Sequence, residues 1–128
     1  MTYYVARSGQ STFNYVNLHD GRGEIAVQRL FGKKHSWNID LDIWEIPPGT
    51  SEGSHIHDGS DLEYGFMDEI YLILEGQAEM TIDGKIELLN EGDSVLCKAG
   101  SDHNLVNIGM KNLKVLLISD PDVESRGD

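Results

Sequence analysis

The sequence predicts an all-β fold in which about eight short antiparallel strands form a barrel or a sandwich. Three observations support this prediction. Short apolar segments recur along the chain, and each is bounded by glycine, proline, asparagine or aspartate. Few segments show the spacing of apolar residues that is typical of helices. Asp83-Gly84 separates two of the apolar segments, which is the signal of a two-residue hairpin turn.

The first two expected strands precede a break in the chain at Pro47-Pro48-Gly49. Proline cannot donate to a sheet, so this segment ends the second strand and begins a loop. The next strand is mostly a continuous apolar run, which is typical of a strand buried on both faces. In chain order, the expected strands are 24–31, 38–46, 69–74, 78–82, 85–89, 94–97, 105–108 and 113–118.

The two ends of the chain show weaker patterns. The N-terminal segment contains aromatic residues, among them Tyr3, Tyr4 and Tyr15, without a clear period. Residues 119–128 are polar and lack apolar periodicity, so we expect a flexible tail there. The length of 128 residues suits one domain, 1–128, which is long enough to bury a core.

Composition and charge argue against several classes of partner. A net charge of −12 argues against nucleic acids, because phosphate binding needs clustered lysine and arginine, and equally against anionic membranes. No apolar stretch reaches the length of a membrane span, and the N-terminus lacks the pattern of a secretory signal. The single Cys97 cannot form an intrachain disulfide, which suits a reducing cytosol. We therefore expect a cytoplasmic protein without nucleic-acid or membrane partners.

Four side chains indicate a metal site: His55, His57, Glu69 and His103. Residues two apart in a strand point to the same face, so His55 and His57 can direct both imidazoles to one point. Glu69 begins a buried strand, and His103 lies just before the strand 105–108. Glu63 competes with Glu69 for the carboxylate position, although its surroundings are typical of a turn.

Imidazole nitrogens with one carboxylate suit iron(II), manganese, nickel, cobalt, copper or zinc better than calcium or magnesium. Four protein ligands leave two positions open on an octahedral ion, and these admit water, dioxygen or a chelating substrate. We expect one divalent transition metal per chain, with iron(II) favoured, and assign no residue to an organic cofactor. The remaining histidines, His19 and His35, are expected at the surface.

The segments around these residues resemble the two motifs of the cupin superfamily. The segment between His57 and Glu69 is longer than the family pattern, and Lys98 replaces a usual proline. The resemblance implies a double-stranded β-helix, or jelly-roll, barrel with His55, His57, Glu69 and His103 as metal ligands. It also implies a homodimer. The residues that carry the resemblance are Gly49, His55, His57, Glu69 and Gly76 in the first motif and Gly92, Gly100, His103 and Asn107 in the second.

A small barrel of this kind suits a small organic substrate better than a polymer. Our leading hypothesis is a metal-dependent enzyme with a non-haem iron dioxygenase-type reaction, in which Tyr71 or Glu63 is the general acid or base. The same ligands in cupins also serve isomerases, cyclases, decarboxylases and lyases, in which the metal is a Lewis acid. The rival class is a non-catalytic cupin that binds a small ligand.

Overall fold

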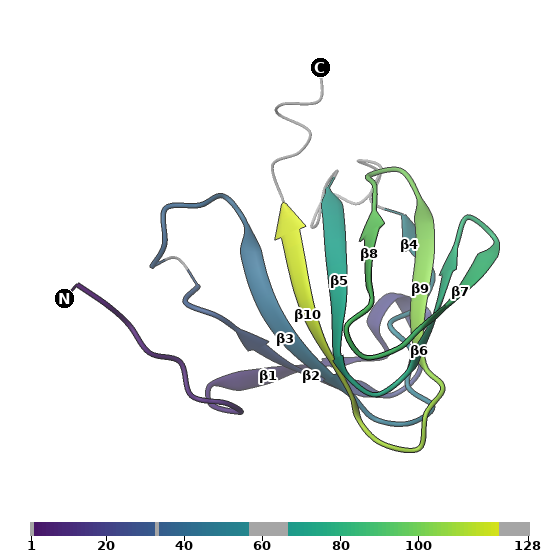
Figure 1. Ribbon diagram of the computed structural model, residues 1–128, viewed down its shortest axis with the longest axis horizontal. Coiled ribbons are helices and arrows are strands. Elements are labelled where there is room, and N and C mark those ends of the chain that lie inside the picture. The colour runs from purple at the N-terminus through teal and green to yellow at the C-terminus, as the bar shows by residue number, and fades with distance from the viewer. Residues whose placement is uncertain (1, 33, 57–66, 121–128) are drawn as a thin grey trace.

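The computed structural model describes residues 2–32, 34–56 and 67–120, and this part of the chain is almost entirely β-structure (Figure 1). It contains antiparallel strands and one short 3-10 helix, and no helix within it is long and apolar enough to cross a membrane. The elements are β1 (Thr12–Val16), η1 (Leu18–Asp20), β2 (Glu24–Arg29), β3 (Asp40–Ile46), β4 (His55–Ile56), β5 (Asp68–Glu75), β6 (Ala78–Ile82), β7 (Lys85–Leu89), β8 (Ser94–Cys97), β9 (Asp102–Asn107) and β10 (Leu113–Asp120).

The strands form two sheets. The larger sheet has the order β1-β2-β3-β10-β5-β8, and the smaller sheet has the order β4-β9-β6-β7. Figure 1 shows β3, β10 and β5 side by side, with the smaller sheet beyond β8. Strands far apart in the sequence, such as β3 and β10, are direct neighbours, as jelly-roll barrels require. The prediction of an all-β jelly roll is confirmed.

Each of the eight expected strands is present, with ends that differ from the expected bounds by a few residues. Two further strands lie outside these eight ranges. β1 was not expected, because it is exposed at all but one position and lacks the alternation that identifies a half-buried strand. β4 carries His55, for which a strand was expected, and has only two residues. β10 extends to Asp120 and so includes the first two residues of the expected tail, whereas 121–128 lie outside the described residues.

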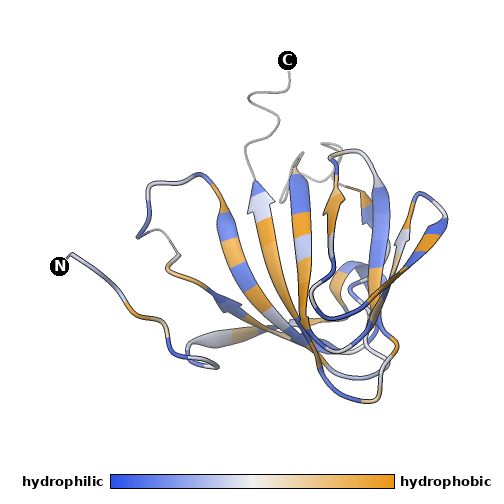
Figure 2. Cartoon of the chain, in the orientation of Figure 1, coloured by the Kyte–Doolittle hydropathy of each residue, from blue (hydrophilic) through white to orange (hydrophobic). Residues whose placement is uncertain are grey.

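The core is built by alternation of period two along the strands. In β10, Leu113, Val115 and Leu117 are buried, and the residues between them are partly exposed. Figure 2 shows this alternation as apolar and polar bands along the ribbons. The same alternation in β9 buries His103 and Leu105 on one face. A strand held by its apolar residues thereby directs His103 into the barrel.

Candidate metal site

Three of the four expected ligands lie within the described residues, and they converge. His55 in β4 pairs with His103 in β9, and Glu69 is in β5 of the other sheet. The Nε2 atom of His103 lies 3.0 Å from Oε1 of Glu69, and Nε2 of His55 lies 3.6 Å from the same oxygen. Ligands at adjacent corners of an octahedron, each about 2.1 Å from a metal, are separated by about 3 Å. The two distances to Glu69 are close to this separation, and donor atoms of His55 and His103 lie within 4.8 Å of each other.

Backbone carbonyls fix the orientation of both imidazoles. Nδ1 of His55 lies 2.8 Å from the Gly53 carbonyl oxygen, and Nδ1 of His103 lies 3.3 Å from that of Ser101. A carbonyl oxygen only accepts, so each Nδ1 donates to its carbonyl, and Nε2 is the ring nitrogen that faces Glu69. This arrangement is the usual outer support of a metal-binding histidine.

The metal-free site favours a proton on His55. Burial opposes the charged ring, but the hydrogen bond with Glu69, the charge of Glu52 and the Gly53 carbonyl together raise the pKa of His55 to about 9. A metal ion has to displace that proton, because only the neutral imidazole is a ligand. The same carboxylates that favour the proton also favour a cation, so the site is electrostatically suited to a metal.

Glu52 is a residue of the site that the sequence did not indicate. The residue is 1% exposed, and one of its carboxylate oxygens lies within 4.8 Å of a ring nitrogen of His55 and of one of His103, which also lie within that distance of each other. Burial raises the pKa of Glu52 to about 7; the positive charges of His55 and His103 act in the opposite direction, and Glu69 adds to the rise. Because Glu52 lies in a loop, no strand period marks it as inward-facing.

Tyr71 holds this second carboxylate in place. Its hydroxyl donates to Glu52, with Oε1 and Oε2 at 3.0 and 2.9 Å, and the backbone N–H of Leu105 donates to Oε1 at 3.1 Å. Burial, together with the charges of Glu52 and Glu69, raises the pKa of Tyr71 well above its ordinary value, so the hydroxyl keeps its proton. The acid or base role expected for Tyr71 stays a prediction. Two other expected site residues, His57 and Glu63, lie outside the described residues.

A cavity of about 360 Å³ opens beside the cluster. Among its lining residues, Arg29 donates to both carboxylate oxygens of Asp42, at 2.8 and 2.9 Å. The cavity therefore carries more acidic than basic side chains. It is lined by Tyr15, Leu18, His19, Arg29, Asp40, Asp42, Trp44, Glu52, His55, Met67, Glu69, Leu117 and Ser119.

His19 does not lie at the surface as expected. It is half-buried and lines the cavity, and its ring stacks on His55 with centroids 4.0 Å apart and an angle of 14° between the planes. His19 comes from η1, which follows β1, whereas His55 lies far along the chain in β4. Sequence patterns do not reveal this contact, because η1 is too short to show a period.

Two glycines bring η1 against the segment that precedes His55. A Cβ atom on Gly53 would lie 2.4 Å from the carbonyl oxygen of Leu18, and a Cβ atom on Gly21 would lie 2.6 Å from the backbone nitrogen of Gly53. Only residues without a side chain permit this approach. The Ser51 N–H also donates to the Arg22 carbonyl at 3.0 Å. The backbones that present His19, Glu52 and His55 are thus held together.

We expect Gly53→Ala to destabilise the protein by about 2 kcal/mol more than Gly92→Ala. Both glycines have φ near +90°, so both substitutions place alanine in a strained conformation. Only at Gly53 does the new Cβ meet backbone atoms, whereas at Gly92 there is nothing within 4 Å. Urea unfolding of the two variants measures the difference, and equal losses of stability would show that η1 moves away without cost.

Comparisons with known proteins identify the family to which this fold belongs. Residues 42–119 match the model of the family described as Cupin domain. An oxalate-binding protein of Thermotoga maritima is 31% identical over 120 residues, which cover 91% of this chain and 93% of the relative.

Two solved structures are also similar. A predicted oxalate decarboxylase of Thermotoga maritima has a TM-score of 0.79 with 28% identity, over 91% of this chain and 98% of that one. A cupin 2 conserved barrel domain protein of Salinispora arenicola has a TM-score of 0.70 with 22% identity, over 93% of this chain and 89% of that one. Since the family match spans more than half of the chain and the whole barrel is shared, this protein belongs to the cupin family.

Proposed function

We propose that this cupin holds one divalent transition metal with His55, His57, Glu69 and His103, and that the metal site binds a small carboxylate of the oxalate type. The observation that supports the metal most directly is the convergence of His55 and His103 on one oxygen of Glu69. Two imidazoles and a carboxylate favour iron(II), manganese, nickel, cobalt, copper or zinc. We retain iron(II) as the first choice.

Oxalate is the first ligand to test because the Thermotoga maritima relative is named an oxalate-binding protein. The acidic lining of the cavity would repel a dianion unless a metal offset its charge. A small dicarboxylate can chelate through oxygens at two open positions. The charge of the cavity therefore requires such a ligand to bind at the metal end, beside His55 and Glu69.

The type of reaction at the metal is a further part of the proposal. A bound divalent metal supplies Lewis-acid or redox chemistry at its open positions. The chain's own groups hold the imidazole of His55 in place, direct the Tyr71 hydroxyl to Glu52 and shield the site from water. We retain a dioxygenase-type reaction of iron(II) as the catalytic hypothesis. Decarboxylation without net redox change, or ligand binding without turnover, are its competitors.

The test is the metal content of freshly purified protein, followed by calorimetric titration of the metal-loaded protein with oxalate. We expect about one equivalent of transition metal and saturable oxalate binding that chelator treatment removes. Consumption of dioxygen with iron-loaded protein and candidate substrates would support the dioxygenase. Protein that takes up no metal even after reconstitution would overturn the metal-dependent function, and metal without oxalate binding would overturn the carboxylate assignment.

The outer face of the larger sheet carries an apolar patch that supports the proposed homodimer. In the strand register, Leu116 lies between Ile43 and Leu72, and Ile70 lies between Ile118 and Leu96. These side chains are half-buried or exposed, and Leu96 is 52% exposed. A chain of net charge −12 repels a second copy least across an uncharged face. We propose that two copies pack through this patch.

The dimer is tested by light scattering on the wild type and two variants. Leu96→Glu places a charge in the patch, whereas Leu88→Glu places one on β7 of the other sheet, where Leu88 is 64% exposed. We expect the wild type and Leu88→Glu to be dimers and Leu96→Glu to be a monomer. A monomeric wild type would refute the dimer, and a dimeric Leu96→Glu would place the interface elsewhere.

We also retain a cytoplasmic location as part of the proposed function.

A further inference from the structure

His19 belongs to the cavity but neither to the expected ligand set nor to the motifs around it. Its ring lies 4.0 Å from the ring of His55, nearly parallel to it, and forms part of the cavity wall. His55 directs Nε2 toward Glu69, so a ring stacked on His55 borders the same space. His19 therefore flanks the positions at which a further ligand of the metal would enter.

The backbone holds His19 in a conformation that few residues adopt. Asn17, His19 and Asp20 have φ values of 48°, 50° and 61°, in the left-handed region that is uncommon for residues other than glycine. Such a conformation persists only where surrounding contacts maintain it. Here the Gly21 N–H donates to the Leu18 carbonyl at 2.7 Å, and Gly21 packs directly on Gly53. The turn is thus fixed with His19 facing the cavity.

The charges of the cavity show what His19 can contribute. Four carboxylates line it, those of Asp40, Asp42, Glu52 and Glu69. Arg29 already donates to both oxygens of Asp42, which holds its guanidinium at that carboxylate. A carboxylate ligand at the metal needs a hydrogen-bond donor on its other oxygens, because a buried acceptor without a donor is costly. An imidazole beside His55 is placed to supply one.

We propose that His19 is a ligand-binding residue, which donates a hydrogen bond from a ring nitrogen to an oxygen of the small carboxylate that occupies the metal's open positions. This inference rests on the proposed function, since it needs both the metal and the carboxylate. It assigns to η1, a turn outside the two family motifs, a direct part in recognition. It also explains why the chain holds a strained histidine against a metal ligand.

The test compares His19→Asn with Asp20→Asn, both loaded with cobalt(II) and titrated with oxalate by calorimetry. Both variants place asparagine in η1 at positive φ, which asparagine tolerates. Asp20 is exposed and is not part of the cavity lining. We expect both variants to retain cobalt like the wild type. Oxalate affinity is expected to fall by at least about tenfold in His19→Asn and by less than about twofold in Asp20→Asn.

A third variant separates direct contact from support of His55. His19→Phe keeps an aromatic face against His55 but has no ring nitrogen, so we expect it to lose oxalate affinity as His19→Asn does while keeping cobalt. If His19→Phe binds oxalate like the wild type, His19 acts by stacking and the direct contact is refuted. Unchanged oxalate affinity in His19→Asn would also refute it.

Failure of the proposed function gives a different result in the same experiment. Wild-type protein that takes up no cobalt would overturn the metal site, and with it the role of His19. Wild-type protein that takes up cobalt but does not bind oxalate would leave the metal site intact and overturn both the carboxylate assignment and the inference. If the wild type binds oxalate and the affinity falls equally in Asp20→Asn and His19→Asn, the turn acts only through its structure and the direct contact is refuted.

Discussion

His103→Ala is expected to weaken cobalt(II) binding by at least about 100-fold, because loss of a direct ligand costs no less than loss of its outer support. Nε2 of His103 lies 3.0 Å from Oε1 of Glu69, and the ring is fully buried. Its removal takes away the imidazole that lies 0.6 Å nearer to Glu69 than His55 does, at 3.0 Å against 3.6 Å. Competition with a coloured chelator measures the affinity, and circular dichroism verifies that the variant folds.

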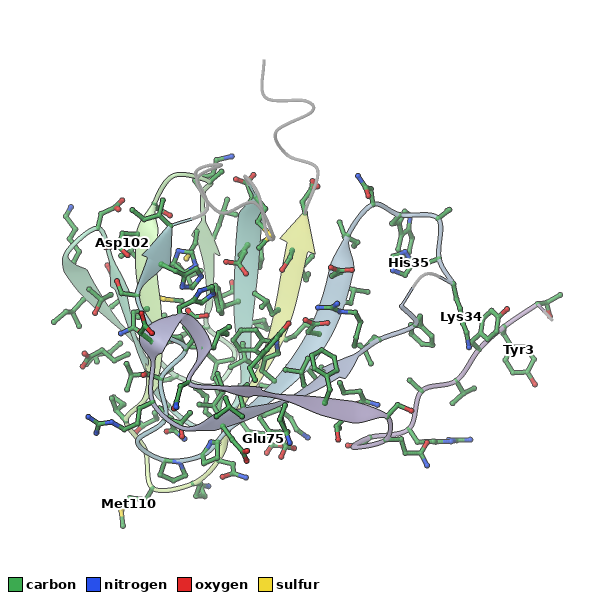
Figure 3. All side chains as sticks on the ribbon, turned by 180° about the vertical axis from the view of Figure 1, so that it is seen from behind. Tyr3, Lys34, His35, Glu75, Asp102 and Met110 are labelled. Carbon is green, nitrogen blue, oxygen red and sulfur yellow. The ribbon has the colours of Figure 1, made fainter. Side chains whose placement is uncertain are left out.

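His35→Ala is the matched control for this substitution. Figure 3 shows His35 on the opposite side of the molecule from Asp102, which directly precedes His103 in β9. Loss of His35 also removes one imidazole, but far from the cluster, so we expect cobalt affinity to stay within about twofold of the wild type. Equal affinities of the wild type and His103→Ala would exclude His103 from the metal site.

Glu52→Gln is expected to stabilise the metal-free protein by about 3 kcal/mol at pH 8. Burial raises the pKa of Glu52 from 4.5 to about 7, so the folded state holds its proton more tightly than the unfolded state does. A difference of one in pKa is worth about 1.4 kcal/mol of stability. Glutamine imitates the neutral acid and still offers an oxygen to the Tyr71 hydroxyl, so it avoids the cost of ionisation.

The sign of this effect fixes its pH dependence. Between pH 4.5 and about 7 the folded state binds more protons at Glu52 than the unfolded state, so the wild type loses stability as pH rises through this window. The difference between Glu52→Gln and the wild type is therefore expected to be near zero below pH 4.5 and to level off above pH 7.

Urea unfolding in the presence of a chelator, repeated across this pH range, measures the difference. Glu87→Gln, which removes an exposed carboxylate from β7, serves as the control and should show no such window. In metal-loaded protein the order should reverse, because a cation favours the ionised Glu52. A Glu52→Gln variant that is less stable than the wild type at pH 8 without metal would contradict the raised pKa of Glu52.

Much of the fold followed from local patterns in the sequence. Strands such as β5 and β10 are rich in apolar residues, which favours a buried extended chain, and alternation along them determines which residues face inward. Glu69 and His103 were identified by their residue types and their spacing from Gly76 and Gly100, and the structure buries both. Their convergence with His55 depends on pairing of β4 with β9, which the sequence did not predict.

The rest of the site depends on contacts between distant loops. Glu52 is buried because Tyr71 and the Leu105 amide bind its carboxylate, and neither partner is close to it in the sequence. His19 reaches the cavity because Gly21 and Gly53 allow two backbones to touch. A loop glutamate and a lone histidine look like solvated residues in a sequence, since their burial is decided only when the barrel closes.

The positions of the ligands also have a mechanical consequence. His55 and His103 belong to the smaller sheet, and Glu69 belongs to the larger one, so an ion held by all three would clasp the two halves of the barrel. Separating the sheets would then require breaking metal–ligand bonds, and the free energy of metal binding would resist opening of the barrel. Amide hydrogen exchange should therefore slow on metal binding along the whole of β9 and β5, and not only at His103 and Glu69, because the metal holds the two sheets together.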